Sequence, residues 1–139
     1  MSIIGRLFKR RQVLELADPV FGQIAFDQGI WTFVPKSPAD GFMITVDAPE
    51  TGPTAEQRAI FGQFRARVGE FEQRARDYMR PRVDDAVDVS RLSTYSVEIG
   101  SGQDTPPQGF VLELSDADGI VIHRVAFRAG EAVDYGCDD

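Results

Sequence analysis

A single amphipathic stretch constrains the fold most: residues 54–80, TAEQRAIFGQFRARVGEFEQRARDYMR. Its large apolar residues recur in steps of three and four, which places them on one face of an α-helix. Thr54 and Gln57 match a capping box at the start, and Pro81 disfavours helical backbone at Arg80. We therefore predict one long helix whose apolar side covers a sheet. The apolar positions are Ile60, Phe61, Phe64, Val68, Phe71, Ala75, Tyr78 and Met79.

The opposite side of this helix carries small residues (Ala55, Ala59, Gly62, Ala66 and Gly69) flanked by arginines. Small residues let a second element approach closely. One interpretation is therefore a second packing surface, for the N-terminal segment or for another copy of the helix. The other is an exposed face, on which Glu70–Arg74 and Glu72–Arg76 are spaced to pair. The candidate partner-binding residues are Arg58, Arg65, Arg76, Gly62, Ala66 and Gly69.

Strand-like runs lie on both sides of the helix. Residues 42–48 alternate apolar and polar side chains, as in a sheet with one covered and one solvated face. The order predicts an α+β fold, in which one long helix covers one face of an antiparallel sheet of six to seven strands (β-β-β-α-β-β-β). Residues 82–92 predict a short second helix or an irregular return, and residues 100–109 a flexible loop. The predicted strands are 21–27, 30–34, 42–48, 95–99, 110–114, 120–127 and 132–135.

The length of 139 residues suits one domain, which we place at 18–139 behind a basic amphipathic segment at 1–17. That segment lacks the order of a secretory signal, and no run is long enough to span a membrane. It docks on its own domain or contacts an anionic membrane, and we favour docking. The lone cysteine, Cys137, excludes an internal disulfide and favours a reducing compartment, so we expect a cytoplasmic protein.

The formal net charge of −7 is unevenly distributed. Arginines outnumber acidic residues between 54 and 82, so the remainder of the chain is more acidic still. Such a chain repels nucleic acid overall, and we expect no nucleic-acid partner. An acidic surface instead complements a basic protein partner.

No residue pattern predicts catalysis. His123 is the only histidine, and its place beside Val125 on one strand face favours a semi-buried strand residue over a general base. Cys137 lies near the chain end, which is a poor platform for a nucleophile, so a Cys–His dyad is not favoured. Nucleotide-loop, nucleophile-elbow and zinc-protease motifs are absent from the sequence.

Two acidic groups are better explained without a metal. Residues 116–119 (DADG) resemble the start of a calcium loop, but the closing glutamate is missing, so we predict a hairpin turn. Asp84, Asp85 and Asp88 are interpreted as a solvated surface rather than a cation site. We therefore predict neither a cofactor nor a metal.

The opening Asp18-Pro19-Val20-Phe21-Gly22, the strand to Trp31 and the run Val46 to Ala48 before a long helix resemble a group of uncharacterised bacterial domains. This domain-of-unknown-function group has an Asp-x-x-Phe-Gly opening, and some members lie beside polymorphic toxin genes and are regarded as immunity-like. The resemblance covers residues 18–135 and implies a small cytoplasmic bacterial protein that binds a partner. It implies no catalytic residues.

Three hypotheses of function follow. The first is a non-enzymatic domain that binds another protein, such as a toxin. The second is a small-ligand-binding protein or small enzyme, with a pocket between sheet and helix and His123 near its mouth. The third is a homodimer formed through the small-residue side of the helix.

Overall fold

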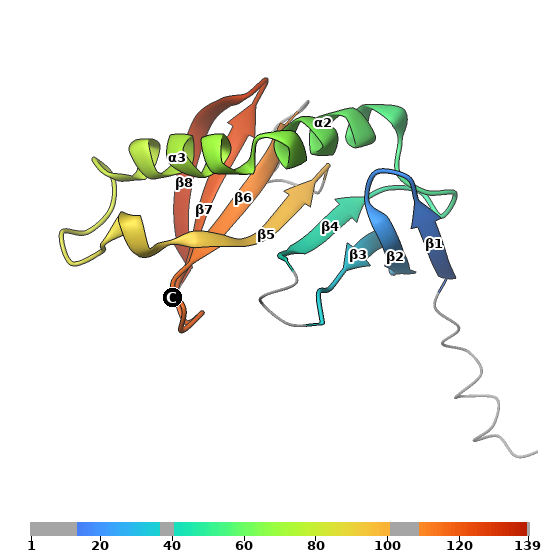
Figure 1. The fold of residues 1–139 in the computed structure, drawn as a ribbon, viewed down its shortest axis with the longest axis horizontal. Coiled ribbons are helices and arrows are strands. Elements are labelled where there is room, and N and C mark those ends of the chain that lie inside the picture. Colours follow the sequence, from blue (N-terminus) through green and yellow to red (C-terminus); the bar gives the residue numbers. More distant parts are fainter. Residues whose placement is uncertain (1–13, 37–40, 101–108, 139) are drawn as a thin grey trace, which may run out of the picture.

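The structure is a computed structural model and describes residues 14–36, 41–100 and 109–138. In these residues two helices cross one face of an eight-stranded sheet, whose strands lie side by side in chain order (Figure 1). The predicted α+β class is thus confirmed. The strands are β1 (Leu14–Asp18), β2 (Gly22–Asp27), β3 (Ile30–Phe33), β4 (Met43–Asp47), β5 (Ser93–Ile99), β6 (Gly109–Ser115), β7 (Ile122–Arg128) and β8 (Glu131–Asp138).

The prediction of an antiparallel sheet was wrong at its centre, because β4 and β5 pair in parallel, with Ile44 opposite Val97. The other neighbouring strands are antiparallel. A tight turn between neighbouring strands reverses the chain, whereas a helical crossover returns it to the same end of the sheet. The helical segment between β4 and β5 is such a crossover, so these adjacent strands run the same way.

The sheet also has one strand more than predicted. Residues 14–17, which were assigned to the basic N-terminal segment, belong to β1 and pair with β2. The turn between the two strands is closed by Asp18, whose Oδ2 accepts hydrogen bonds from the amides of Val20 (2.9 Å) and Phe21 (3.0 Å). Residues 1–13, for which docking was predicted, lie outside the described residues.

The single long helix was a second incorrect detail. Two helices, α2 (Ala55–Ala66) and α3 (Val68–Met79), follow one another and are separated at Arg67, where φ is −139° and ψ is 42°. The break lies between Phe64 and Phe71, and both rings pack on Phe110 of β6, with centroids 5.3 and 5.4 Å away. One interrupting residue leaves the three-and-four spacing of the sequence intact, so periodicity did not reveal it.

The predicted ends of the helical segment are confirmed. Thr54 Oγ1 accepts from the amide of Gln57 at 3.1 Å, and Gln57 Oε1 accepts from the amide of Thr54 at 2.9 Å, which completes the capping box. The helix ends at Met79, but not for the predicted reason, because Arg80 keeps helical angles (φ −48°, ψ −49°). Pro81 ends the helix by lacking the amide hydrogen that a further turn needs.

The core lies between the helices and the sheet. Phe64 is completely buried and is surrounded by the rings of Phe42, Phe61, Phe71 and Phe110, with centroids 5.3 to 6.3 Å away. The predicted inward face of residues 42–48 is confirmed by the burial of Ile44, Val46 and Ala48 and by the edge-on packing of Phe42 on Phe64.

The return from α3 to β5 is irregular, with one short 3₁₀ helix at Val89–Arg91 whose Val89 is buried. The predicted hairpin turn at 116–119 is present, and the Gly119 amide donates to the Asp116 carbonyl at 3.2 Å. The loop predicted at 100–109 falls largely on residues 101–108, outside the described residues. Within the described ranges no helix is both long and apolar enough to cross a membrane.

Candidate functional site

The face of β5–β8 that points away from the helices carries a group of charged side chains. Val97 and Ile99 of β5 join the core beneath the helices, so Glu98 between them points to the other face. The strand register continues this face over β6, β7 and β8, because Glu113 pairs with Arg124 and Ala126 pairs with Asp134. We call these side chains the acidic face, which consists of Glu98, Glu113, Arg124, Asp134 and Asp138.

Arg124 lies at the centre of the acidic face and contacts three carboxylates. Its Nη2 is 3.0 Å from Glu98 Oε2, its Nε is 3.6 Å from Glu113 Oε2, and its Nη1 is 3.3 Å from Asp138 Oδ2. The other oxygen of Glu113 accepts a hydrogen bond from the buried Ser96 hydroxyl. One positive charge faces three negative ones, so these four side chains together carry an excess of two negative charges.

Partial burial of these charges changes the pKa values of Glu98 and Arg124. The pKa of Glu98 is raised above its ordinary value by burial and by repulsion from Glu113, and Arg124 offsets these effects only partly. Burial alone lowers the pKa of the Arg124 guanidinium, but the surrounding carboxylates outweigh it and raise that pKa. Arg124 therefore stays charged at neutral pH, while the ionised form of Glu98 is disfavoured by its surroundings.

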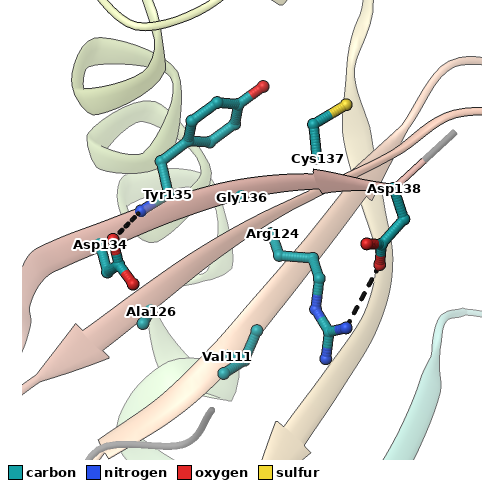
Figure 2. Close-up of a pocket in the computed structure, with 8 residues that line it drawn as sticks. All are labelled: Val111, Arg124, Ala126, Asp134, Tyr135, Gly136, Cys137 and Asp138. Atoms are coloured by element: carbon teal, nitrogen blue, oxygen red, sulfur yellow. Dashed lines mark hydrogen bonds and ion pairs between the residues drawn. The ribbon is translucent and has the colours of Figure 1, made fainter.

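A pocket of about 340 Å³ opens beside this group, under β8 (Figure 2). Figure 2 shows Arg124, Asp134 and Asp138 on one side of β8 and the side chains of Tyr135 and Cys137 on the other. The pocket floor is apolar, formed by Val111 and Ala126, and its rim is polar. Gly136 adds no side chain to the rim, so the pocket is accessible between Asp134 and Asp138.

His123 lies in a second pocket, on the helix side of the sheet. The side chain is only 3% exposed, so the predicted semi-buried residue is in fact buried. Its Nδ1 is 2.8 Å from the Tyr135 hydroxyl. The pocket, of about 550 Å³, lies between the α3–β5 connection and the β6–β7 hairpin rather than under the helices. Its lining includes Val87, Asp88, Arg91, Asp116, Val121 and His123.

Cys137, although near the chain end, lies in β8 and is an exposed free cysteine. It is the cross-strand partner of His123 in the sheet register. The Nδ1 of His123 contacts the Tyr135 hydroxyl, and the Cys–His dyad stays disfavoured.

The three candidate partner-binding arginines each bind their own chain. Arg58 contacts Asp18 at 2.7 Å, and Arg65 Nη1 donates to the Val20 carbonyl at 2.9 Å. Arg76 donates to the Leu92 carbonyl through Nε (3.3 Å) and Nη2 (3.0 Å). These contacts attach the helices to the ends of neighbouring strands.

The small-residue side of the helices faces outward. Ala66 and Gly69 are exposed, and a Cβ added at Gly62 or Gly69 would meet no atom within 4 Å outside its own helix and chain neighbours. The described elements therefore leave room for a second copy or another element on this side. The second packing surface stays a prediction.

The two predicted ion pairs along the helix had different outcomes. Glu70 and Arg74 form one, at 2.9 Å. Glu72 instead accepts hydrogen bonds from the Thr94 amide (2.9 Å) and hydroxyl (2.7 Å), and so links α3 to β5. The pairing of Glu72 with Arg76 was therefore a wrong prediction, because both side chains bind the sheet side of the domain.

The loop carboxylates have local roles. Asp84 accepts from the Ala86 amide at 3.0 Å, and Asp88 accepts from the Ser90 amide at 3.1 Å. The hydroxyl and amide of Ser90 lower the pKa of Asp88 by their hydrogen bonds. Among the residues that the structure describes, no three histidine, cysteine or acidic side chains are grouped to hold a metal ion.

No protein-family model, no curated protein and no solved structure matches this chain. Its function must therefore be argued from the site itself. Sequence patterns did not reveal the acidic face, because its members are scattered along the chain over residues 98–138. The available signal was alternation on β5 and β6: Glu98 lies between the core residues Val97 and Ile99, and Glu113 lies between Leu112 and Leu114. Both are charged where a one-sided sheet needs only polar side chains.

Proposed function

We propose that this chain is a non-enzymatic, immunity-like domain that binds a basic surface of another protein through its acidic face. The observation that carries the proposal is that Glu98, Glu113 and Asp138 share the single guanidinium of Arg124. Half-buried carboxylates with too few cations are costly in isolation, and they are complementary to a basic partner.

The charge pattern suits both recognition and association rate. Asp134 and Asp138 at the rim are exposed and attract a basic partner from solution. Glu98 and Glu113 lie deeper, where a partner cation would be partly desolvated and its attraction stronger. The net charge of −7 acts in the same direction. An exposed free cysteine suits the reducing cytoplasm, where we place the protein.

Affinity capture with the full chain, from extracts of the source cells, tests this proposal. We expect a stoichiometric, basic protein partner whose affinity falls as salt is added, because screening weakens the attraction. In calorimetry, Asp134→Asn with Asp138→Asn should weaken binding about tenfold, since each exposed pair contributes up to about 1 kcal/mol.

Glu50→Gln with Asp85→Asn is the matched control, because it removes the same charge from exposed positions outside the acidic face. Recovery of no stoichiometric partner, or a partner whose affinity is insensitive to salt and to the Asp134 and Asp138 changes, would count against the proposal.

The pocket beside His123 supports a second candidate function, the binding of a small ligand. Its volume of about 550 Å³ is in the range of small-molecule sites. A thermal-shift screen of common metabolites against wild type and His123→Gln separates the candidates. A compound that stabilises the wild type and not His123→Gln favours ligand binding, and a compound that stabilises both equally binds elsewhere.

A further inference from the structure

The outer edge of β8 is the feature from which we infer how the partner binds. β8 is the last strand of the sheet, and among the described residues it pairs with β7 alone. With eight residues it is the longest of the described strands, and most of these residues are exposed. An edge strand presents a row of backbone amides and carbonyls that an extended segment from another chain can pair with.

The charges on β8 decide what kind of strand fits. Glu131, Asp134 and Asp138 all lie on it, and two of them belong to the acidic face. A second copy paired antiparallel about the centre of β8 would place Glu131 against Asp138, and like charges opposite one another are destabilising. A heterologous strand that carries lysine or arginine at alternate positions meets the opposite charge instead.

Gly136 is the position on β8 at which a side chain of the partner fits. Gly136 lies between Asp134 and Asp138 on the pocket side of β8, and a Cβ placed there would meet no described atom within 4 Å beyond Gly136 itself and its two chain neighbours. Neighbouring strands are about 4.8 Å apart. A long cationic side chain opposite Gly136 can therefore lean over it toward the pocket of about 340 Å³ and lie between Asp134 and Asp138. Arg124, the cross-strand partner of Gly136, lines the same pocket, so the added cation shares these carboxylates with it.

We propose that an extended basic segment of the partner adds to the outer edge of β8, with a lysine or arginine opposite Gly136. This inference rests on the proposed function and states its binding mode. The added strand forms main-chain hydrogen bonds with β8, and its alternate cationic side chains lie against Asp134 and Asp138. Affinity comes from the backbone pairing and selectivity from the charges.

The test uses the full chain, labelled with ¹⁵N, and a short capped peptide that alternates lysine with valine. We expect chemical-shift changes centred on residues 134–138, and slower hydrogen exchange at alternate amides of β8, because only every second amide faces the added strand. A peptide that alternates glutamate with valine should produce neither. Asp134→Asn with Asp138→Asn should weaken lysine-peptide binding about tenfold, whereas Glu50→Gln with Asp85→Asn should leave it unchanged.

Several outcomes would overturn the inference. These are no shift changes at millimolar lysine peptide, changes centred on β1 or on the helices, and equal binding of both peptides. Protection of β8 without peptide, together with a dimeric mass in sedimentation, would show that a second copy occupies the edge. If the natural partner depends on Glu98 and Glu113 but leaves the β8 amides unprotected, strand addition is wrong and the proposed function remains.

Discussion

Asp18 of β1 and Arg58 of α2 form a partly buried contact across 40 residues of sequence. Oδ1 of Asp18 accepts hydrogen bonds from Nη2 (2.7 Å) and Nε (2.8 Å) of the Arg58 guanidinium. Oδ2 accepts hydrogen bonds from the amides of Val20 and Phe21. The Asp18 side chain is completely buried. This carboxylate thus closes the β1–β2 turn and fastens α2 to the edge of the sheet.

We expect Asp18→Ala to lower the free energy of unfolding by about 2 to 3 kcal/mol, because it removes charged hydrogen bonds and leaves two turn amides without their acceptor. Burial by itself raises the pKa of Asp18, but the hydrogen bonds from Arg58, Phe21 and Val20 and the charge of Arg58 outweigh it, and the pKa is lowered. Its contribution is therefore present above the unfolded-state pKa, near 3.8, and is lost as the pH falls through the lower folded-state value.

Urea unfolding from pH 7 to pH 2 measures this effect. The wild type should lose more stability on acidification than Asp18→Ala, with Asp85→Ala as the exposed control. Parallel pH curves for wild type and Asp18→Ala would show that the carboxylate makes no such contribution.

We expect the contribution of Glu98 to the free energy of unfolding to have the opposite pH dependence. Its folded-state pKa is raised, so the protonated form stabilises the fold at low pH, and that stability is lost as the pH rises from about 4.5 through the folded-state value. Glu98→Gln mimics the protonated form. We therefore expect it to unfold at higher urea concentration than the wild type at pH 7 and to show a flatter pH curve. A Glu98→Gln variant less stable than the wild type at pH 7 would show that the bond to Arg124 outweighs burial and repulsion.

Phe64 is the centre of the aromatic core, and its removal should be among the most damaging single changes. It is completely buried, with four rings around it. We expect Phe64→Ala to lower the free energy of unfolding by about 3 to 5 kcal/mol, from lost burial and the cavity left behind. Gln63→Ala, at an exposed position of the same helix, should change it by less than about 0.5 kcal/mol. Similar losses in the two variants would contradict the packing described.

Substitutions on the small-residue side of the helices distinguish a monomeric from a dimeric protein. Gly62 is inside α2 with open space around it, so Gly62→Ala should raise the free energy of unfolding by up to about 1 kcal/mol. Gly69→Leu should leave the solution mass of a monomer unchanged. A drop in mass from dimer to monomer in Gly69→Leu, measured by sedimentation, would instead identify this side as an interface between copies.

Local patterns in the sequence predicted much of the structure. The capping box at Thr54, the alternation of residues 42–48 and the turn at 116–119 depend on neighbours within a few residues, and all three are present. The break at Arg67 was missed because the apolar spacing continues across it. β1 was missed because its few alternating residues adjoin a basic run that was interpreted together with them.

The acidic face and the pairing of strands could not be predicted, for a different reason. Glu98, Glu113 and Arg124 become neighbours only when β5, β6 and β7 adopt their register, and nothing in each strand alone specifies that register. Likewise, Ile44 and Val97 pair in parallel because a helical crossover returns the chain to the same end of the sheet.

The sequence by itself determined the amphipathic helical segment, most of the strands and the α+β class, since these follow from the periodicity of apolar side chains. Only the tertiary structure decided which charges meet. The physical reason is range: secondary structure depends on residues a turn or a few positions apart, whereas the carboxylates around Arg124 are brought together by backbone pairing between strands distant in the chain.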